Sequence, residues 1–214
     1  MMRNPDLQRL TREMYDEVDA LMADPEMASV TKHGLSPLYG PLTVNPDVAI
    51  ITFQGGGDDN RVQTRPPERL LYVDDDHKFG RTLRKYMQEA GLHETLVKRT
   101  VAHATVFPQA PTQDAASWVR STPGPKAEWR KFSKRWAERL LEAQSSKVLL
   151  FFGEKVSRMI GVQWTAQERN TKQNHLTFAR SEWRGMPAIY CHHLSIGCPR
   201  TEAIRCMREV KSLI

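Results

Sequence analysis

Apolar residues follow two different spacings along the chain. Between residues 5 and 22 they recur every three or four positions with charged residues between them, which predicts an amphipathic helix. Elsewhere they form short continuous runs, which are typical of strands buried on both faces of a parallel sheet. The predicted strands occupy residues 48–53, 100–107, 147–152 and 187–191.

Helical patterns alternate with the predicted strands. The clearest ones run through residues 79–90, 126–144, 154–160 and 199–213. Strands that alternate with helices form a mostly parallel sheet with helices on both faces. The sequence therefore predicts the α/β class, as a three-layer α/β/α sandwich around a sheet of about four strands. We expect an N-terminal helix at 1–25 that packs on or flanks a single α/β domain at 26–214.

The composition is that of a globular chain large enough to form a core without disulfides or bound metal. Of the 214 residues, 40% are hydrophobic and 26% are charged, and the formal net charge is +6. A basic surface attracts polyanions, so DNA or RNA is the natural class of partner. No apolar run approaches the roughly 18 residues that a membrane crossing requires, so we expect no membrane contact of that kind.

The three cysteines, Cys191, Cys198 and Cys206, lack the spacing of a zinc or iron–sulfur site. An odd number of thiols and the lack of a secretory signal pattern indicate a reducing compartment, and we expect a cytoplasmic protein. We also expect no metal and no cofactor.

Polar or glycine-containing segments follow each predicted strand. They include residues 54–59, 103–111, 153 and 192–195. The carboxyl ends of parallel strands share one edge of a sheet, and ligands of open α/β sheets bind at that edge. We therefore expect the functional site there.

The order of these segments resembles that of the uracil-DNA glycosylase superfamily. A first strand enters a glycine-containing loop at 48–57, and residues 80–92 are similar to the family's helix pattern G-x-x-L-x-x-x-L-x-x-A-G-L. A strand with a proline-rich turn, a K-V-x-L-x-x-G segment and a terminal His-x-Ser follow in the family's order. These three segments are residues 101–111, 147–153 and 193–195, and the whole resemblance covers residues 40–214.

The resemblance implies hydrolysis of the N-glycosidic bond of a uracil-like base that is extruded from DNA. In such enzymes a polar side chain of the first loop positions water. The histidine of the last loop stabilises the negative charge of the departing base. These catalytic roles would fall to Gln54, or to Asp58 slightly further along, and to His193.

The resemblance also implies that loop residues contact the base and the neighbouring phosphates. The candidates are Phe53, Gly55, Gly56, Gly57, His103, Thr105 and Ser195. Three departures from the family pattern affect the chemistry. Gln54 replaces the family's Asp or Asn and can orient water but cannot act as a carboxylate base. The Asn that reads uracil has no counterpart beyond the nearby His103 and Thr105, and Leu194 replaces a proline.

Three functions remain open at this level. The first is a DNA-base glycosylase, and the second is a protein that retains the fold to bind nucleic acid or nucleotide without releasing a base. The third is a different doubly wound enzyme that binds a phosphorylated small molecule at the glycine loop, because one topology supports many chemistries.

Three charged segments have simple interpretations beside functional ones. The basic helix at 126–144 is interpreted as a solvated helix face rather than a DNA-binding face. The polar residues 169–175 fit either a phosphate contact or ordinary surface. The acidic run at 74–76 is a weak candidate for a cation site, because it lacks further spaced ligands.

Overall fold

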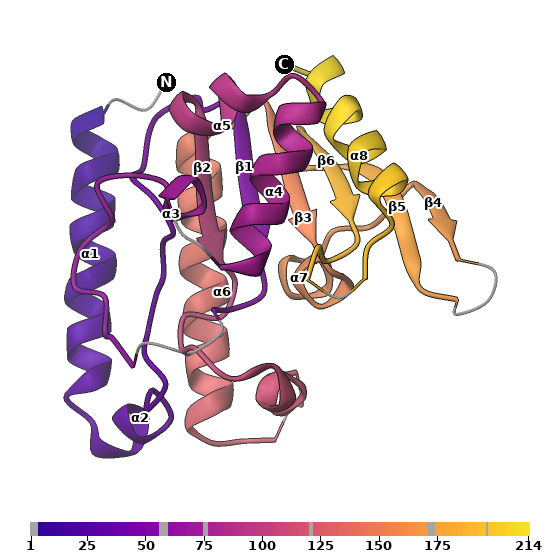
Figure 1. Ribbon diagram of the computed structural model, residues 1–214. Helices are drawn as coiled ribbons and strands as arrows, with labels where there is room; N and C mark the ends of the chain where they lie inside the picture. The colour runs from indigo at the N-terminus through magenta and orange to yellow at the C-terminus, as the bar shows by residue number, and fades with distance from the viewer. Residues whose placement is uncertain (1–3, 56–59, 75–76, 120–121, 171–173, 196) are drawn as a thin grey trace.

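A single mixed β-sheet forms the centre of the protein. The computed structural model describes residues 4–55, 60–74, 77–119, 122–170, 174–195 and 197–214. Its six-stranded sheet has the order β2-β1-β3-β6-β5-β4 (Figure 1). The strands are β1 (Val48–Thr52), β2 (Thr100–Ala104), β3 (Val148–Phe152), β4 (Ala166–Arg169), β5 (Leu176–Trp183) and β6 (Met186–Cys191).

The four strands β2, β1, β3 and β6 are parallel neighbours. Ile50 of β1 lies level with Ala102 of β2 and Leu150 of β3, and all three side chains are fully buried. Burial on both faces accounts for the continuous apolar runs in these strands. The predicted α/β class is therefore confirmed, and the four predicted strands form the parallel part of the sheet.

The sheet has six strands rather than the four expected. The two additional strands, β5 and β4, continue the sheet from β6 as an antiparallel pair. All four residues of β4 are exposed, and β5 is buried continuously only over its first four residues. An exposed edge strand carries no apolar run, so its sequence alone gives no strand signal.

Helices cover both faces of the sheet. In Figure 1, α4 and α8 lie in front of the sheet and α6 lies behind it. The helices are α1 (Asn4–Met22), α2 (Pro25–Ser29), α3 (Leu71–Asp74), α4 (Lys78–Glu89), α5 (His93–Lys98), α6 (Pro125–Gln144), α7 (Glu154–Ile160) and α8 (Arg200–Ser212), with a 3-10 helix, η1, at Thr112–Trp118. Within the described ranges, no helix has the length and apolar character needed to cross a membrane.

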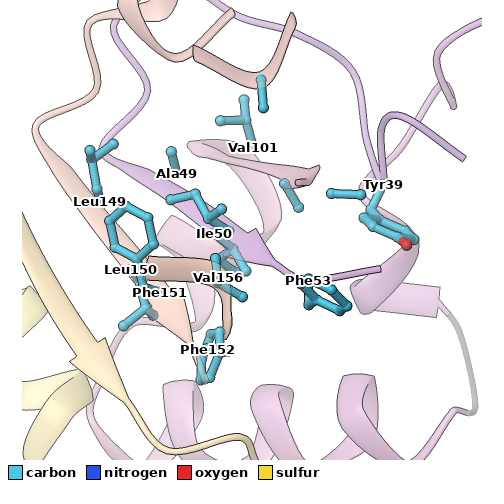
Figure 2. Close-up of a cluster of buried hydrophobic side chains, with 14 of the residues drawn as sticks. Tyr39, Ala49, Ile50, Phe53, Val101, Leu149, Leu150, Phe151, Phe152 and Val156 are labelled. Carbon is cyan, nitrogen blue, oxygen red and sulfur yellow. The ribbon is translucent and has the colours of Figure 1, made fainter. Parts of the chain in front are cut away.

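The core lies between the sheet and these helices. Figure 2 shows part of it, with Ile50 of β1, Leu149 and Phe151 of β3 and Val156 of α7. These side chains are fully buried. Burial of a large apolar side chain stabilises the fold by about 1.5–3 kcal/mol. Because these side chains come from neighbouring strands and from the helix that follows β3, their packing holds the strands in place relative to each other.

The N-terminal helix α1 packs against α6 through specific polar contacts. The carboxylate of Glu17 accepts hydrogen bonds from Arg135 and, at 3.1 Å, from the indole nitrogen of Trp136. Arg139 pairs with Glu13 at 3.4 Å in the same interface. Arg135 and Arg139 of α6 therefore face acidic partners on α1, which supports the interpretation of this part of α6 as a structural helix face rather than a DNA-binding face.

Candidate functional site

The carboxyl ends of four parallel strands meet at one edge of the sheet. The strands β2, β1, β3 and β6 are consecutive neighbours, and their arrowheads point toward the lower edge in Figure 1. The segments that follow them contain Thr105, Gln54, Gly153 and His193. The segments after β1, β2 and β6 contain predicted site residues. They lie far apart in the sequence, and the fold brings all three to this edge of the sheet.

Thr105 joins the ends of β1 and β2. Its backbone nitrogen donates to the Thr52 carbonyl at 3.0 Å, and its hydroxyl lies 3.2 Å from the carbonyls of both Thr52 and Phe53. The Thr105 side chain is fully buried. Its hydroxyl is therefore occupied by the main chain and shapes the loop instead of presenting a free group to a ligand.

His103 is directed into the protein rather than toward the edge. Its Nε2 lies 2.6 Å from Oε1 of Gln144 on α6, and the side chain is buried. Burial lowers the pKa of His103 to about 4, because the charged imidazolium is poorly solvated there. This geometry gives His103 a structural contact between β2 and α6.

Gly55 fits a space that admits no side chain. A β-carbon at this position would lie 2.8 Å from the hydroxyl of Tyr39 and 3.0 Å from the side chain of Gln109. The Gly55 carbonyl accepts a hydrogen bond from the backbone of Ala110 at 3.2 Å. The loop after β1 is thus packed closely against residues from two other segments.

The other residues predicted in this loop, Gly56, Gly57 and Asp58, lie outside the described residues. Their proposed roles stay predictions. The acidic run is described only at Asp74, which pairs with Arg69 at 3.1 Å, and the rest of that run also lies outside the described ranges.

Gln54 carries an unusual buried amide. Both its Nε2 and its Oε1 are shielded from solvent, and neither has a hydrogen-bond partner among the described residues. A buried polar group without a partner costs about 1–3 kcal/mol, so such groups in proteins generally hold water or a ligand. The amide offers one donor group and one acceptor, which suits the orientation of a water molecule or the edge of a base.

His193 is held as a neutral hydrogen-bond donor. Burial, together with the nearby His192 and His77, lowers the pKa of His193 to about 4, so its ring is uncharged at neutral pH. The backbone nitrogen of Ser195 donates to Nδ1 of His193 at 3.3 Å. Because Nδ1 accepts this bond, the single proton of the neutral ring lies on Nε2. Within the described part of the chain, Nε2 has no partner and is free to donate.

Aromatic rings line the approach to His193. The ring of Phe79, at the start of α4, lies 5.2 Å from the imidazole and 5.0 Å from the ring of Phe152. Tyr72 packs against Phe79, and Tyr39 stacks on Tyr72 with 5.4 Å between ring centres. Figure 2 shows Phe53 beyond the end of β1 and Phe152 at the end of β3. The apolar surroundings explain why the imidazole stays uncharged.

Sequence reasoning missed several of these residues. Tyr39 and Tyr72 come from segments that were expected to be irregular, and no local pattern indicates that they approach the strand ends. Phe79 was expected only as part of a helix. Phe79 lies two residues after His77, whose Nδ1 accepts a bond from the Phe79 backbone at 3.3 Å, so its position follows from the capping of α4.

Two lysines lie close to the same loops. The Lys155 ammonium lies 5.7 Å from the centre of the Phe53 ring, and it has no carboxylate partner in the described ranges. Lys78 donates to the Ser195 carbonyl at 3.2 Å. The Ser195 hydroxyl is buried and has no partner among the described residues. Cations and a hydroxyl in this arrangement suit an anion such as a phosphate.

The described residues contain no group of three or more His, Cys, Asp or Glu side chains that could hold a metal ion.

No protein-family model matches the chain, and no curated protein matches it. The resemblance to the uracil-DNA glycosylase superfamily consequently depends on the ordered sequence segments alone.

Proposed function

We propose that this protein hydrolyses the N-glycosidic bond of a uracil-like base extruded from DNA. One observation carries the proposal: the sheet edge carries both the Nε2–H of a neutral His193 and the buried amide of Gln54, and neither group has a hydrogen-bond partner among the described residues. The first group suits a base that leaves as an anion, and the second suits the water that replaces it.

The reaction needs stabilisation of charge on the leaving base. As the bond between the base and the deoxyribose carbon breaks, its electron pair moves onto the base. A donor already fixed in apolar surroundings stabilises that charge without reorganising, and Nε2–H of His193 meets this requirement. Water supplies the hydroxyl that bonds to the sugar carbon, and its other proton neutralises the departing base.

Gln54 contributes by orientation rather than by proton abstraction. Its amide oxygen accepts a hydrogen bond from water but does not act as a carboxylate base. Among the described residues of this loop no carboxylate is present, and a site that orients water with an amide depends more strongly on the departure of the base than on the strength of the nucleophile. We therefore propose a slow glycosylase in which His193 contributes more to the rate than Gln54 does.

DNA reaches this edge through electrostatic contacts. The net charge of +6 favours a polyanion, and Lys155 and Lys78 lie beside the loops that would meet the extruded nucleotide. Phosphate contacts of this kind position the strand, while the groups inside the site recognise the base.

The test uses labelled single- and double-stranded DNA that contains one uracil, followed by alkali, which cleaves the strand at a released base. We expect cleavage at uracil with the wild-type protein and its loss with His193→Ala. The matched control is His93→Ala, because His93 is exposed at the start of α5, which precedes β2 and so lies toward the amino ends of the strands. Undiminished cleavage by the His193→Ala protein would contradict the assignment.

A second function is favoured by two features of the same site. Gln54 stands where the family has Asp or Asn, and the side chains of His103 and Thr105 are occupied within the protein. A protein that retained the fold to bind nucleic acid or nucleotide would need neither a carboxylate nor a reader of uracil. This alternative predicts retention of DNA on a gel that weakens steeply with salt, without any release of base.

A further inference from the structure

The three cysteines of the chain gather at the carboxyl end of β6. Cys191 is the last residue of β6, Cys198 lies just before α8, and Cys206 lies in α8. The Cys191 thiol interacts with the thiols of both Cys198 and Cys206. The Cys206 thiol also donates to the Tyr190 carbonyl at 3.6 Å. Two thiols from different parts of the chain therefore lie against that of Cys191.

The thiols differ in their access to solvent. Cys191 and Cys206 have no exposed surface, whereas Cys198 is only partly buried. The interaction with Cys191 lowers the pKa of the Cys198 thiol, and burial raises the pKa of Cys191. A thiol that is accessible and more easily ionised reacts first with an oxidant, so Cys198 is the entry point.

We propose that Cys198 and Cys191 form a modification site for peroxides, at which oxidation closes a disulfide across the segment that carries His193. The proposal is independent of base release, because it concerns the covalent state of the protein alone. Cys198 is the thiol that meets the peroxide, and Cys191 is the buried thiol that resolves it.

The chemistry balances in two steps. The sulfur of Cys198 attacks one oxygen of hydrogen peroxide, the oxygen–oxygen bond breaks, and water leaves as Cys198 becomes a sulfenic acid. The sulfur of Cys191 then attacks the sulfur of Cys198, the sulfur–oxygen bond breaks, and a second water leaves with the proton of the Cys191 thiol. Two thiols are oxidised by two electrons, and one peroxide is reduced to two waters.

The cross-link would restrain the loop after β6 at both ends. The Cys191 carbonyl already accepts a hydrogen bond from the Gly153 backbone at 3.1 Å, and Cys198 leads directly into α8. His193 lies between the two cysteines. A covalent bond between them closes a short ring that limits the motion of His193, as disulfides restrict chain freedom in general.

The test treats the purified full-length chain with hydrogen peroxide in the absence of DNA. Free thiols are then alkylated in denaturant, and the intact mass and the peptides are measured. We expect the number of free thiols to fall from the three in the chain to one, with a peptide that joins Cys191 to Cys198. Dithiothreitol should restore all three thiols, because a disulfide is reversible and the higher oxides of cysteine are not.

Two variants distinguish a cross-link between Cys191 and Cys198 from one between Cys191 and Cys206. Cys198→Ser should keep two free thiols after peroxide, because the remaining thiols are both buried, and its partly exposed position makes loss of folding a small concern. Cys206→Ala should still form the cross-link. A peptide that joins Cys191 to Cys206, or irreversible oxidation of Cys198 without a cross-link, would overturn the proposal.

A structural readout tests the effect on the loop. Hydrogen exchange of the backbone amides between Cys191 and Cys198 should slow in the oxidised protein and recover on reduction, since slower exchange reports rarer local opening. Equal exchange in the two forms would show that the cross-link does not restrain the His193 segment.

Discussion

At the scale of single residues, the protonation state of His193 is set by the groups that surround it. The ring of Phe79 lies against the imidazole and is itself backed by Phe152, and the Ser195 backbone fixes the tautomer. A histidine in such surroundings acts as a permanent neutral donor instead of a group that gains a proton near neutral pH.

This leads to a prediction for the titration of His193. We expect its imidazole signals in NMR spectra to stay in the neutral form from pH 8 to pH 5 and to shift only near the folded pKa of about 4. The same signals in urea should titrate near the ordinary histidine pKa of about 6.5. A midpoint near 6.5 in the folded protein would contradict the burial described for the ring.

Gly55 provides a second prediction at this scale. Gly55→Ala should destabilise the protein by about 1–3 kcal/mol, because the new methyl group would collide with the Tyr39 hydroxyl and the Gln109 side chain. The urea-unfolding midpoint measures this loss. Tyr39→Phe removes the closest atom, so the cost of Gly55→Ala should be smaller in the Tyr39→Phe background. Additive costs would indicate that the two side chains do not meet.

At the scale of elements, the contact between His103 and Gln144 joins β2 to α6. Gln144→Ala should lower the free energy of unfolding by about 1–3 kcal/mol, because it leaves the buried His103 nitrogen without its partner. Lys131→Ala on the same helix is the control. Its side chain is 72% exposed in a surface ion pair, so its removal should change stability by no more than about 0.5 kcal/mol.

The elements also show how far the sequence could predict this fold. The parallel strands were predictable because burial on both faces forces continuous apolar runs, as in β3. The strand β4 was not, because all its residues are exposed and it exists only through pairing with β5. The apolar pattern of the sequence predicts elements that contact the core, but it gives no signal for an exposed edge strand.

The same distinction applies to the candidate site, of which the sequence predicts one part and not the other. The edge that carries Gln54 and His193 could be predicted, because parallel strands place their carboxyl ends together. The inward direction of His103 could not be predicted, since it depends on a partner forty-one positions away. Tyr39 likewise lies at the site, beside Gly55 and stacked on Tyr72. No local sequence pattern predicts these two contacts.

At the scale of the whole molecule, the buried His103 and the partly buried His193 make stability depend on pH. Burial is the main cause that lowers the pKa values of His103 and His193 to about 4. In the unfolded chain each should titrate near the ordinary value of about 6.5, so the unfolded state binds more protons between these values. Stability is therefore fully present above about pH 6.5 and is lost as the pH falls toward 4.

The expected loss between pH 7.5 and pH 5 is about 2 kcal/mol for each of the two histidines. Urea unfolding at the two pH values measures it, and pH 5 still lies above the range in which most carboxylates titrate. His193→Gln should remove roughly half of the loss while His103 keeps the remainder, because each contribution follows from the burial of one ring. An unchanged loss in His193→Gln would mean that His193 is solvated in the folded protein, and the argument for a neutral donor at the sheet edge would fail with it.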